Sequence, residues 1–259
     1  MTGIAPFHSL EVEDGIALLR IERPARLNAL HPAAHMALAA TFDALAARDD
    51  VRAVILTGEG RAFCAGYDIK DSLEGEEMRI PASGFGGITN RFDFPHPLIA
   101  AVNGPALGGG FEMALACDLI VAADSATFAL PEPRIGWAAL AGGVQRLPRA
   151  IGIKRALGII LTGRTVPAAE GLTLGFVHAV AAPEALLDAA RALAHEIAAC
   201  APLAVRLSRD VAYRSMDMDT AAMLDMANFP AVETLLASED SREGRTAFVE
   251  RRAPVWTGR

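Results

Sequence analysis

One stretch decides the fold of this chain: Leu98-Ile99-Ala100-Ala101-Val102-Asn103-Gly104-Pro105-Ala106-Leu107-Gly108-Gly109-Gly110-Phe111-Glu112. Its first five residues form a continuous apolar run, which is typical of a strand buried on both faces. The triple glycine then leads into a helix that we expect from about Gly109 to Cys117, and Leu119 to Ala122 predicts the next strand. Strand, helix and strand in this order indicate βαβ-type units, and therefore an α/β core.

The segments before this stretch show the same alternation. Residues 16–21 alternate in part between apolar and polar positions, as in a strand, and residues 53–57 form a short apolar run that glycines end. Between them, Pro32 can occupy a first helical turn, and apolar residues then recur at helical spacing. Residues 71–96 are the least regular segment, and a loop of that length in a compact domain is usually functional or mobile.

The chain changes character towards its end, where helical patterns replace strand-like runs. These patterns cover residues 183–199, 202–213, 220–237 and 239–252. We therefore divide the chain into an α/β core, residues 1–196, where we expect any functional site to lie, and a helical region, residues 197–259. A region of about 60 residues is small for independent folding. We expect it to dock on the core or on another subunit.

Bulk composition excludes several classes of protein. The 259 residues are 52% apolar, which suffices for one substantial core with a smaller appendage. A net charge of −7 argues against a nucleic-acid binder, which normally carries a basic face. The longest uncharged stretch, residues 94–111, is broken by prolines and glycines, whereas a membrane helix needs about 20 continuous apolar residues. The N-terminus has no signal-peptide pattern, so we expect a soluble protein.

The cysteines and histidines do not suggest a metal site. Cys64, Cys117 and Cys200 are widely spaced, so we expect them to be buried thiols in a reducing cytoplasm. His31 and His35 have i,i+4 spacing but no clear third ligand, which favours a solvated or capping role. We therefore expect neither a metal nor a redox cofactor.

Two glutamates stand in apolar, glycine-rich settings where packing does not explain a carboxylate. Glu112 follows the triple glycine, and Glu132 ends the run Phe128-Ala129-Leu130-Pro131-Glu132. Carboxylates are almost never fully buried unless they are paired or hydrogen-bonded. Two that converge beside a backbone donor can perform general acid/base chemistry. The plainer alternatives are a first-turn acid favoured by the helix dipole for Glu112 and a salt-bridged strand-end carboxylate for Glu132.

Backbone N–H groups near these acids form a candidate anion site. Gly109 begins a helix, and the first N–H groups of a helix lack partners within it. Tyr67 lies in a segment of small residues, 60–70, that follows a buried strand. If the N–H groups of Tyr67 and Gly109 converge, they form an oxyanion hole, worth roughly 3–4 kcal/mol of transition-state stabilisation. A tight strand-to-helix turn and an ordinary loop are the alternatives.

These motifs, taken in their order along the chain, resemble those of the crotonase (enoyl-CoA hydratase/isomerase) superfamily. The resemblance covers nearly the whole chain and rests on five motifs in register. They are Arg23-Pro24 with Leu27-Asn28-Ala29-Leu30, Phe63–Lys70, Ala101–Gly104 with Gly108–Glu112, Leu130-Pro131-Glu132 with Gly142-Gly143, and Glu243-Gly244 with Ala247–Arg252. Residues 128–132 and the ending 254–259 are most similar to the carnitinyl-CoA dehydratase-like members.

The resemblance implies a fold and a mode of assembly. The fold is an α/β, crotonase-type spiral of β-β-α repeats, followed by a C-terminal helical region that trimerises. Trimers in this superfamily are commonly paired into hexamers, so a trimer or a dimer of trimers is expected.

The resemblance also implies the ligand. An acyl-CoA thioester would bind with its carbonyl oxygen at the N–H groups of Tyr67 and Gly109, and no cofactor is expected, since the coenzyme A is part of this substrate. A strand over Ala65–Lys70 would pass close to the adenine and the pantetheine arm. The residues of that strand taken as CoA-binding are Ala65, Asp68, Ile69 and Lys70. Arg26 and Arg251 match positions that reach the coenzyme A, the first near its phosphates and the second across a subunit boundary.

The two glutamates indicate the reaction class. Hydratases of the superfamily have acidic residues at both positions, whereas double-bond isomerases typically keep only the one that matches Glu132. The implied activity is that of an enoyl-CoA hydratase, a hydro-lyase that adds water to, or removes it from, the 2,3 double bond of a 2-enoyl-CoA. One carboxylate activates water at C3, and the other delivers a proton to C2, where charge builds as an enolate. We assign Glu112 mainly to the water and Glu132 mainly to the C2 proton.

One segment departs from the family's pattern. Ala139 and Leu140 stand where a Pro-Gly pair is expected, and in hydratases the backbone of that glycine helps to position the catalytic water. Leucine still offers its N–H but adds a side chain and restricts φ. Leu140, Trp137 and residues 71–96 are expected to shape the acyl pocket. An isomerase, a racemase or a C–C hydrolase on the same scaffold, and a non-catalytic acyl-CoA binding protein, are the alternatives.

Overall fold

A six-stranded sheet forms the centre of the computed structural model, which describes residues 7–70 and 79–259. The strand order is β1-β2-β3-β4-β6-β9. The strands are β1 (His8–Glu13), β2 (Ile16–Ile21), β3 (Ala53–Gly58), β4 (Leu98–Val102), β6 (Leu119–Ala123) and β9 (Ala179–Ala181). Strands β1 and β2 are antiparallel, and the other neighbouring pairs are parallel. Strands β3 and β4 are buried along their whole length, which explains their continuous apolar sequences.

A second, three-stranded sheet lies beside the first and gives the fold its spiral character. It contains β5 (Ala106–Leu107), β7 (Thr127–Ala129) and β8 (Val166–Pro167). Strand β5 follows β4 of the central sheet, and β7 follows β6 of the central sheet. Each of these two repeats therefore contributes one strand to each sheet. Helix α3 (Gly109–Ala116) leads from β5 to β6, and α6 (Ala168–Leu174) leads from β8 to β9. The expected spiral of β-β-α repeats is confirmed.

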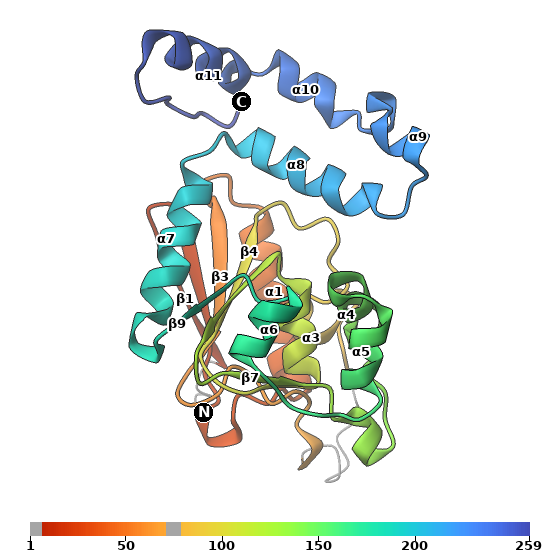
Figure 1. Ribbon diagram of the computed structural model, residues 1–259. Coiled ribbons are helices and arrows are strands. Elements are labelled where there is room, and N and C mark those ends of the chain that lie inside the picture. The colour runs from red at the N-terminus through yellow and green to blue at the C-terminus, as the bar shows by residue number, and fades with distance from the viewer. Residues whose placement is uncertain (1–6, 71–78) are drawn as a thin grey trace.

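Helices cover the central sheet from both sides. Helix α7 (Leu186–Ala198) packs on β2, β3 and β4, whereas α1 (Pro32–Ala46) and α3 lie on the opposite side (Figure 1). The pair α4 (Gly143–Ile151) and α5 (Ile153–Ile160) packs beside α3. These covers bury the sheet, so the catalytic candidates on α3 are held between packed layers.

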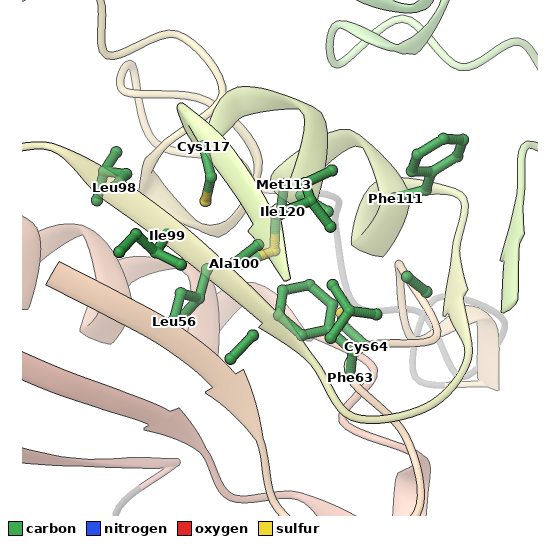
Figure 2. Close-up of a cluster of buried hydrophobic side chains, with 14 of the residues drawn as sticks. Leu56, Phe63, Cys64, Leu98, Ile99, Ala100, Phe111, Met113, Cys117 and Ile120 are labelled. Carbon is green, nitrogen blue, oxygen red and sulfur yellow. The ribbon is translucent and has the colours of Figure 1, made fainter. Parts of the chain in front are cut away.

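Helix α3 is anchored from two directions. Figure 2 shows Met113 of α3, and Cys117 directly after the helix, pointing towards β4, whereas Phe111 points away from that strand. Phe111 packs against Phe128 and Phe176, with ring centroids 5.1 and 5.2 Å apart. Because both faces of this short helix are buried, its first turn is fixed in position.

The C-terminal helices lie beyond one end of the sheet (Figure 1). They are α8 (Pro202–Ser215), α9 (Thr220–Leu224), α10 (Ala231–Ala237) and α11 (Glu239–Glu250). Arg209 of α8 ties them to the core, because its Nε lies 2.7 Å from Asp118 and its Nη1 donates to the carbonyl of Phe94 at 2.9 Å. The division of the chain at residue 196 stays a prediction.

The helical pattern expected over residues 220–237 is confirmed, but the chain divides it into α9, the short turn Met226–Asn228 and α10. Asp225 leaves the helical conformation, and its side chain accepts a hydrogen bond from the N–H of Ala227. Pro230 has no N–H to continue a helix. Of the irregular segment 71–96, residues 71–78 lie outside the described residues. Among the described residues, no helix is both long and apolar enough to cross a membrane.

Candidate active site

The fold brings Glu112 and Glu132 to the same place. Glu112 lies in the first turn of α3, and Glu132 begins the helical turn Glu132–Ile135 that follows β7. Strands β5 and β7 are neighbours, so the residues that follow them meet at one end of the small sheet. Glu112 is 3% exposed and Glu132 is 8% exposed. The alternative of a surface salt bridge for Glu132 does not fit this burial.

Glu112 is held by the start of α4. The N–H of Gly143 donates a hydrogen bond of 2.9 Å to Oε1 of Glu112. Burial, together with the smaller effect of the charge of Glu132, raises the pKa of Glu112 to about 7 despite the hydrogen bond from Gly143. The Ala141 amide and Arg146 act in the opposite direction. A carboxyl group with this pKa can exchange a proton with water at neutral pH.

Glu132 lies against the turn that precedes α3. A Cβ added to Gly108 would lie 2.6 Å from Oε1 of Glu132, and Gly108 has φ +52°. Only glycine adopts this backbone easily while leaving room for the carboxyl group. Burial raises the pKa of Glu132, and its Oε2 accepts no hydrogen bond from any described residue. Glu132 therefore carries a buried oxygen that can hold or deliver a proton.

The two segments expected to form the oxyanion hole lie side by side. Gly109 is the first residue of α3, and a Cβ added to Gly66 would lie 3.2 Å from the backbone nitrogen of Gly109. Leu30 fixes the Gly66-Tyr67 segment, because its N–H donates to Gly66 at 2.8 Å and its carbonyl accepts from Asp68 at 2.9 Å. That the N–H groups of Tyr67 and Gly109 point at one oxygen stays a prediction.

Aromatic and apolar side chains surround these groups. The ring of Phe85 packs on Gly109 so closely that a Cβ there would collide with it. Trp137 lies beside Tyr67, with ring centroids 6.3 Å apart. Leu140 is 70% exposed, and its N–H donates to the carbonyl of Ala138 at 2.9 Å. Leu140 is not among the residues with positive φ, so leucine fits this position without backbone strain.

Residues 11–259 match the model of the enoyl-CoA hydratase/isomerase family. The chain belongs to this family. It is 41% identical to the carnitinyl-CoA dehydratase of Salmonella arizonae, over 93% of this chain and 94% of that protein. The carnitinyl-CoA dehydratase of Proteus mirabilis is also 41% identical, over 82% and 84%. The resemblance seen in the sequence motifs is confirmed.

Solved structures support the same assignment. An enoyl-CoA hydratase from Mycobacterium tuberculosis superposes with a TM-score of 0.93 at 40% identity, over 98% of this chain and all of that chain. One from Bacillus anthracis gives a TM-score of 0.91 at 35% identity, over 98% and 100%. Both share the crotonase fold described above.

The residues expected to bind coenzyme A occupy different environments in this crotonase. Ile69 and Lys70 are exposed beyond Tyr67, and Ala65 is half-buried. Asp68 is buried, and its Oδ2 lies 3.1 Å from Nη2 of Arg23, so Asp68 holds the loop in place. The strand expected over residues 65–70 is wrong. Gly66 has φ +89°, only isolated bridges form at Cys64 and Tyr67, and residues 69–70 are helical.

The two arginines lie on the surface. Arg26 is exposed at the end of the turn Pro24–Arg26, and Arg251 is exposed after α11 with φ +55°. Their contacts with coenzyme A, including the reach of Arg251 across a subunit boundary, stay predictions.

His35 and Arg146 lie near the site of this crotonase and were not anticipated as part of it, whereas the neighbouring His31 has an expected role. His31 caps α1, since its Nδ1 accepts the N–H of Ala34 at 3.0 Å, and this role is confirmed. His35, expected in a solvated or capping role, is instead fully buried. Arg146 of α4 donates to the carbonyl of Thr89 at 2.6 Å and acts electrostatically on Glu112. Its position one helical turn beyond Gly142-Gly143 is the signal that could have identified it.

Proposed function

We propose that this protein is a hydro-lyase that adds water to, or removes it from, the 2,3 double bond of a 2-enoyl-CoA thioester. This proposal rests on Glu112 and Glu132, two buried carboxyl groups with raised pKa values, the first in the first turn of α3 and the second against the turn that precedes it. Family membership and relatives named carnitinyl-CoA dehydratase and enoyl-CoA hydratase support the same reaction.

The chemistry of hydration assigns a role to each group. The Glu112 carboxylate takes a proton from water as the water oxygen bonds to C3. The electrons of the double bond move towards the thioester, and the enolate oxygen is stabilised by the N–H groups of Tyr67 and Gly109. The Glu132 carboxyl group then gives its proton to C2. Dehydration runs through the same steps in reverse.

This mechanism requires no group beyond the protein and its substrate. The thioester makes the C2 proton acidic, backbone N–H groups hold the developing charge, and coenzyme A belongs to the substrate. The names of the relatives make carnitinyl-CoA the first thioester to test, together with a straight-chain 2-enoyl-CoA.

The test follows the ultraviolet absorbance of the conjugated thioester during hydration. We expect reversible loss of absorbance with the native protein and a fall in turnover of at least about 100-fold in Glu112→Gln and Glu132→Gln. The affinity for the CoA ester should change less than about threefold, because neither carboxyl group is assigned to CoA binding. Unchanged turnover in both variants would contradict the mechanism.

Proton exchange at C2 in deuterated water separates the alternatives. A non-catalytic binding protein retains affinity but exchanges no proton. An isomerase or a racemase exchanges the C2 proton, and a C–C hydrolase cleaves a carbon–carbon bond of the acyl group. Product analysis across a panel of acyl-CoA esters identifies which reaction occurs.

The C-terminal helices support self-association as a trimer or a dimer of trimers. Large apolar side chains on α9 to α11 are exposed to an extent that is unusual for a surface facing water: Leu224, Leu236, Phe248 and Val249. Light scattering of the full chain tests this assembly, and a monomer at micromolar concentration would contradict it. The expected cytoplasmic location stays a prediction.

A further inference from the structure

The buried His35 holds the turn that carries Phe85. His35 is fully buried in the first turn of α1, and its Nδ1 accepts the N–H of Gly86 at 2.9 Å. Because Nδ1 is the acceptor, the ring proton lies on Nε2 and the imidazole is neutral. Burial, with smaller effects of the nearby His31 and Arg23, lowers the pKa of His35 to about 4, so the neutral form persists at neutral pH.

The turn that His35 holds, Phe85–Gly87, packs directly on Gly109. Gly86 has φ +60°, and a Cβ there would lie 2.5 Å from Met113, so the turn is wedged between α1 and α3. The N–H of Phe85 donates to Oγ1 of Thr89 at 2.8 Å, and the Phe85 ring then packs on the Cα of Gly109. The ring of His35 meets Phe85 edge to face, with centroids 4.4 Å apart. His35 thus supports the Gly109 side of the oxyanion hole.

The imidazole ring of His35 also lies beside Tyr67, whose N–H is assigned to the other side of the oxyanion hole. The rings of His35 and Tyr67 are nearly parallel, at 15°, with centroids 6.2 Å apart. Trp137 flanks Tyr67, with ring centroids 6.3 Å apart and an interplanar angle of 57°. The buried His35 ring therefore lies beside both Phe85, which packs on Gly109, and Tyr67. Gly109 and Tyr67 carry the two N–H groups assigned to the thioester oxygen.

We propose that His35 is a positioning residue for the oxyanion hole, setting Phe85 against Gly109 from one side and Tyr67 from the other. This role rests on the proposed function, since it requires a thioester carbonyl in the hole. His35 would touch no reacting atom and would act through the placement of the two N–H donors. A small displacement of a hydrogen-bond donor weakens charge stabilisation in the transition state more than it weakens ground-state binding.

The test measures the infrared carbonyl stretch of a bound, saturated acyl-CoA that carries ¹³C at the thioester carbon. In the native protein the N–H groups should lower this frequency relative to the free ester, because they polarise the carbonyl. His35→Leu removes the acceptor for Gly86, so we expect the frequency to move back towards the free value. We also expect kcat to fall about 10- to 100-fold with less than a threefold change in Kd.

Two variants separate positioning from general damage to the fold. His35→Asn keeps an acceptor close to the position of Nδ1 and should restore kcat to within about fivefold of the native value. His96→Leu is the matched control. His96 is also buried, donates one hydrogen bond, to the carbonyl of Leu45 at 2.9 Å, and meets Phe94 edge to face. His96→Leu should lower stability but leave the carbonyl frequency and kcat unchanged.

A native carbonyl frequency and native kcat in His35→Leu would overturn the role of His35, as would equal losses in His96→Leu. If His35→Leu does not fold, the carbonyl frequency is measured in Phe85→Leu instead, because this variant removes the ring from Gly109 and leaves His35 in place. A native frequency in that variant also overturns the proposal. If the native protein binds the ester without any frequency shift, the proposed function itself fails.

Discussion

The N–H of Gly143 donates a hydrogen bond of 2.9 Å to Oε1 of Glu112, so the first residue of α4 holds the carboxyl group carried by the first turn of α3. This amide favours the charged carboxylate, whereas burial favours the protonated acid. Burial is the larger effect, and the pKa of Glu112 settles at about 7. The proton of this group is therefore available for exchange in the range where enzymes operate.

The pH dependence of hydration should report this pKa. The proposed hydration requires a charged Glu112 and a protonated Glu132, so kcat/KM should rise as Glu112 loses its proton near pH 7 and fall once Glu132 is also deprotonated. Initial rates between pH 5.5 and 9 at constant ionic strength measure the profile. The residual activity of Glu112→Gln should lack the rising limb. A profile that is flat from pH 5.5 to 8 would contradict the assignment of Glu112 to the water.

Glu112→Gln should make the folded protein more stable at alkaline pH. The folded-state pKa is about 7, against a usual value near 4.5, so between these values the folded state keeps a proton that the unfolded chain has lost. Stability therefore falls as pH rises through this window. Glutamine does not ionise, and we expect a gain of about 1–3 kcal/mol at pH 8 and almost none at pH 4.5.

Urea denaturation at the two pH values measures this difference. Glu170→Gln serves as a control, because the Arg164 partner lowers the pKa of Glu170 and the exposed pair contributes little. Equal effects of Glu112→Gln at both pH values would show that Glu112 is not destabilised by its burial.

Gly108→Ala should damage the site through a collision with Glu132. The added Cβ would lie 2.6 Å from Oε1 of Glu132, and the backbone has φ +52°. We expect a loss of about 1–3 kcal/mol in the free energy of unfolding and at least about a 100-fold loss of turnover. Gly136→Ala is the matched control, since Gly136 also has positive φ, +78°, but no atom within 4 Å of the added Cβ. That control should lose stability and keep its activity; if Gly108→Ala behaves in the same way, the contact with Glu132 has no catalytic effect.

Arg146→Met should move the acid limb of the rate profile to higher pH. The positive charge of Arg146 lowers the pKa of Glu112, so its removal raises that pKa. The carbonyl of Thr89 also loses its donor, which should cost about 1–3 kcal/mol of stability. Arg149→Met, which removes an exposed arginine paired with Asp217, should leave the profile unchanged. An identical limb in Arg146→Met and the native protein would remove Arg146 from the electrostatics of the site.

Continuous apolar runs predicted the buried strands, because burial on both faces leaves no polar positions. The bounds of β4 agree with the expected range, as do those of β2, which was predicted from partial alternation because it contains Arg20. Strand β1 was not expected, since it is the half-exposed edge strand His8–Glu13 and carries polar residues. The break at Asp225 and Pro230 depends on a local capping bond that competes with helical propensity.

The residues of the candidate site also differ in whether the sequence could predict them. Glu112 and Glu132 could be singled out because an acid among apolar residues and glycines is a local anomaly. His35 has no such signal, since its role depends on a contact with Gly86, 51 residues away. Arg146 reaches Thr89 across 57 residues. Contacts of this kind are set by how α1, α3 and α4 pack, which no short stretch of sequence contains.

The bond between Glu112 and Gly143 also constrains the order of events during synthesis. Its donor leaves the ribosome 31 residues after its acceptor. Until then, docking α3 would bury the Glu112 side chain without the amide that holds it, which is costly for a charged group. The nascent chain should therefore keep this helix undocked until α4 emerges, and trapped chains that end before Gly143 should leave α3 open to proteases.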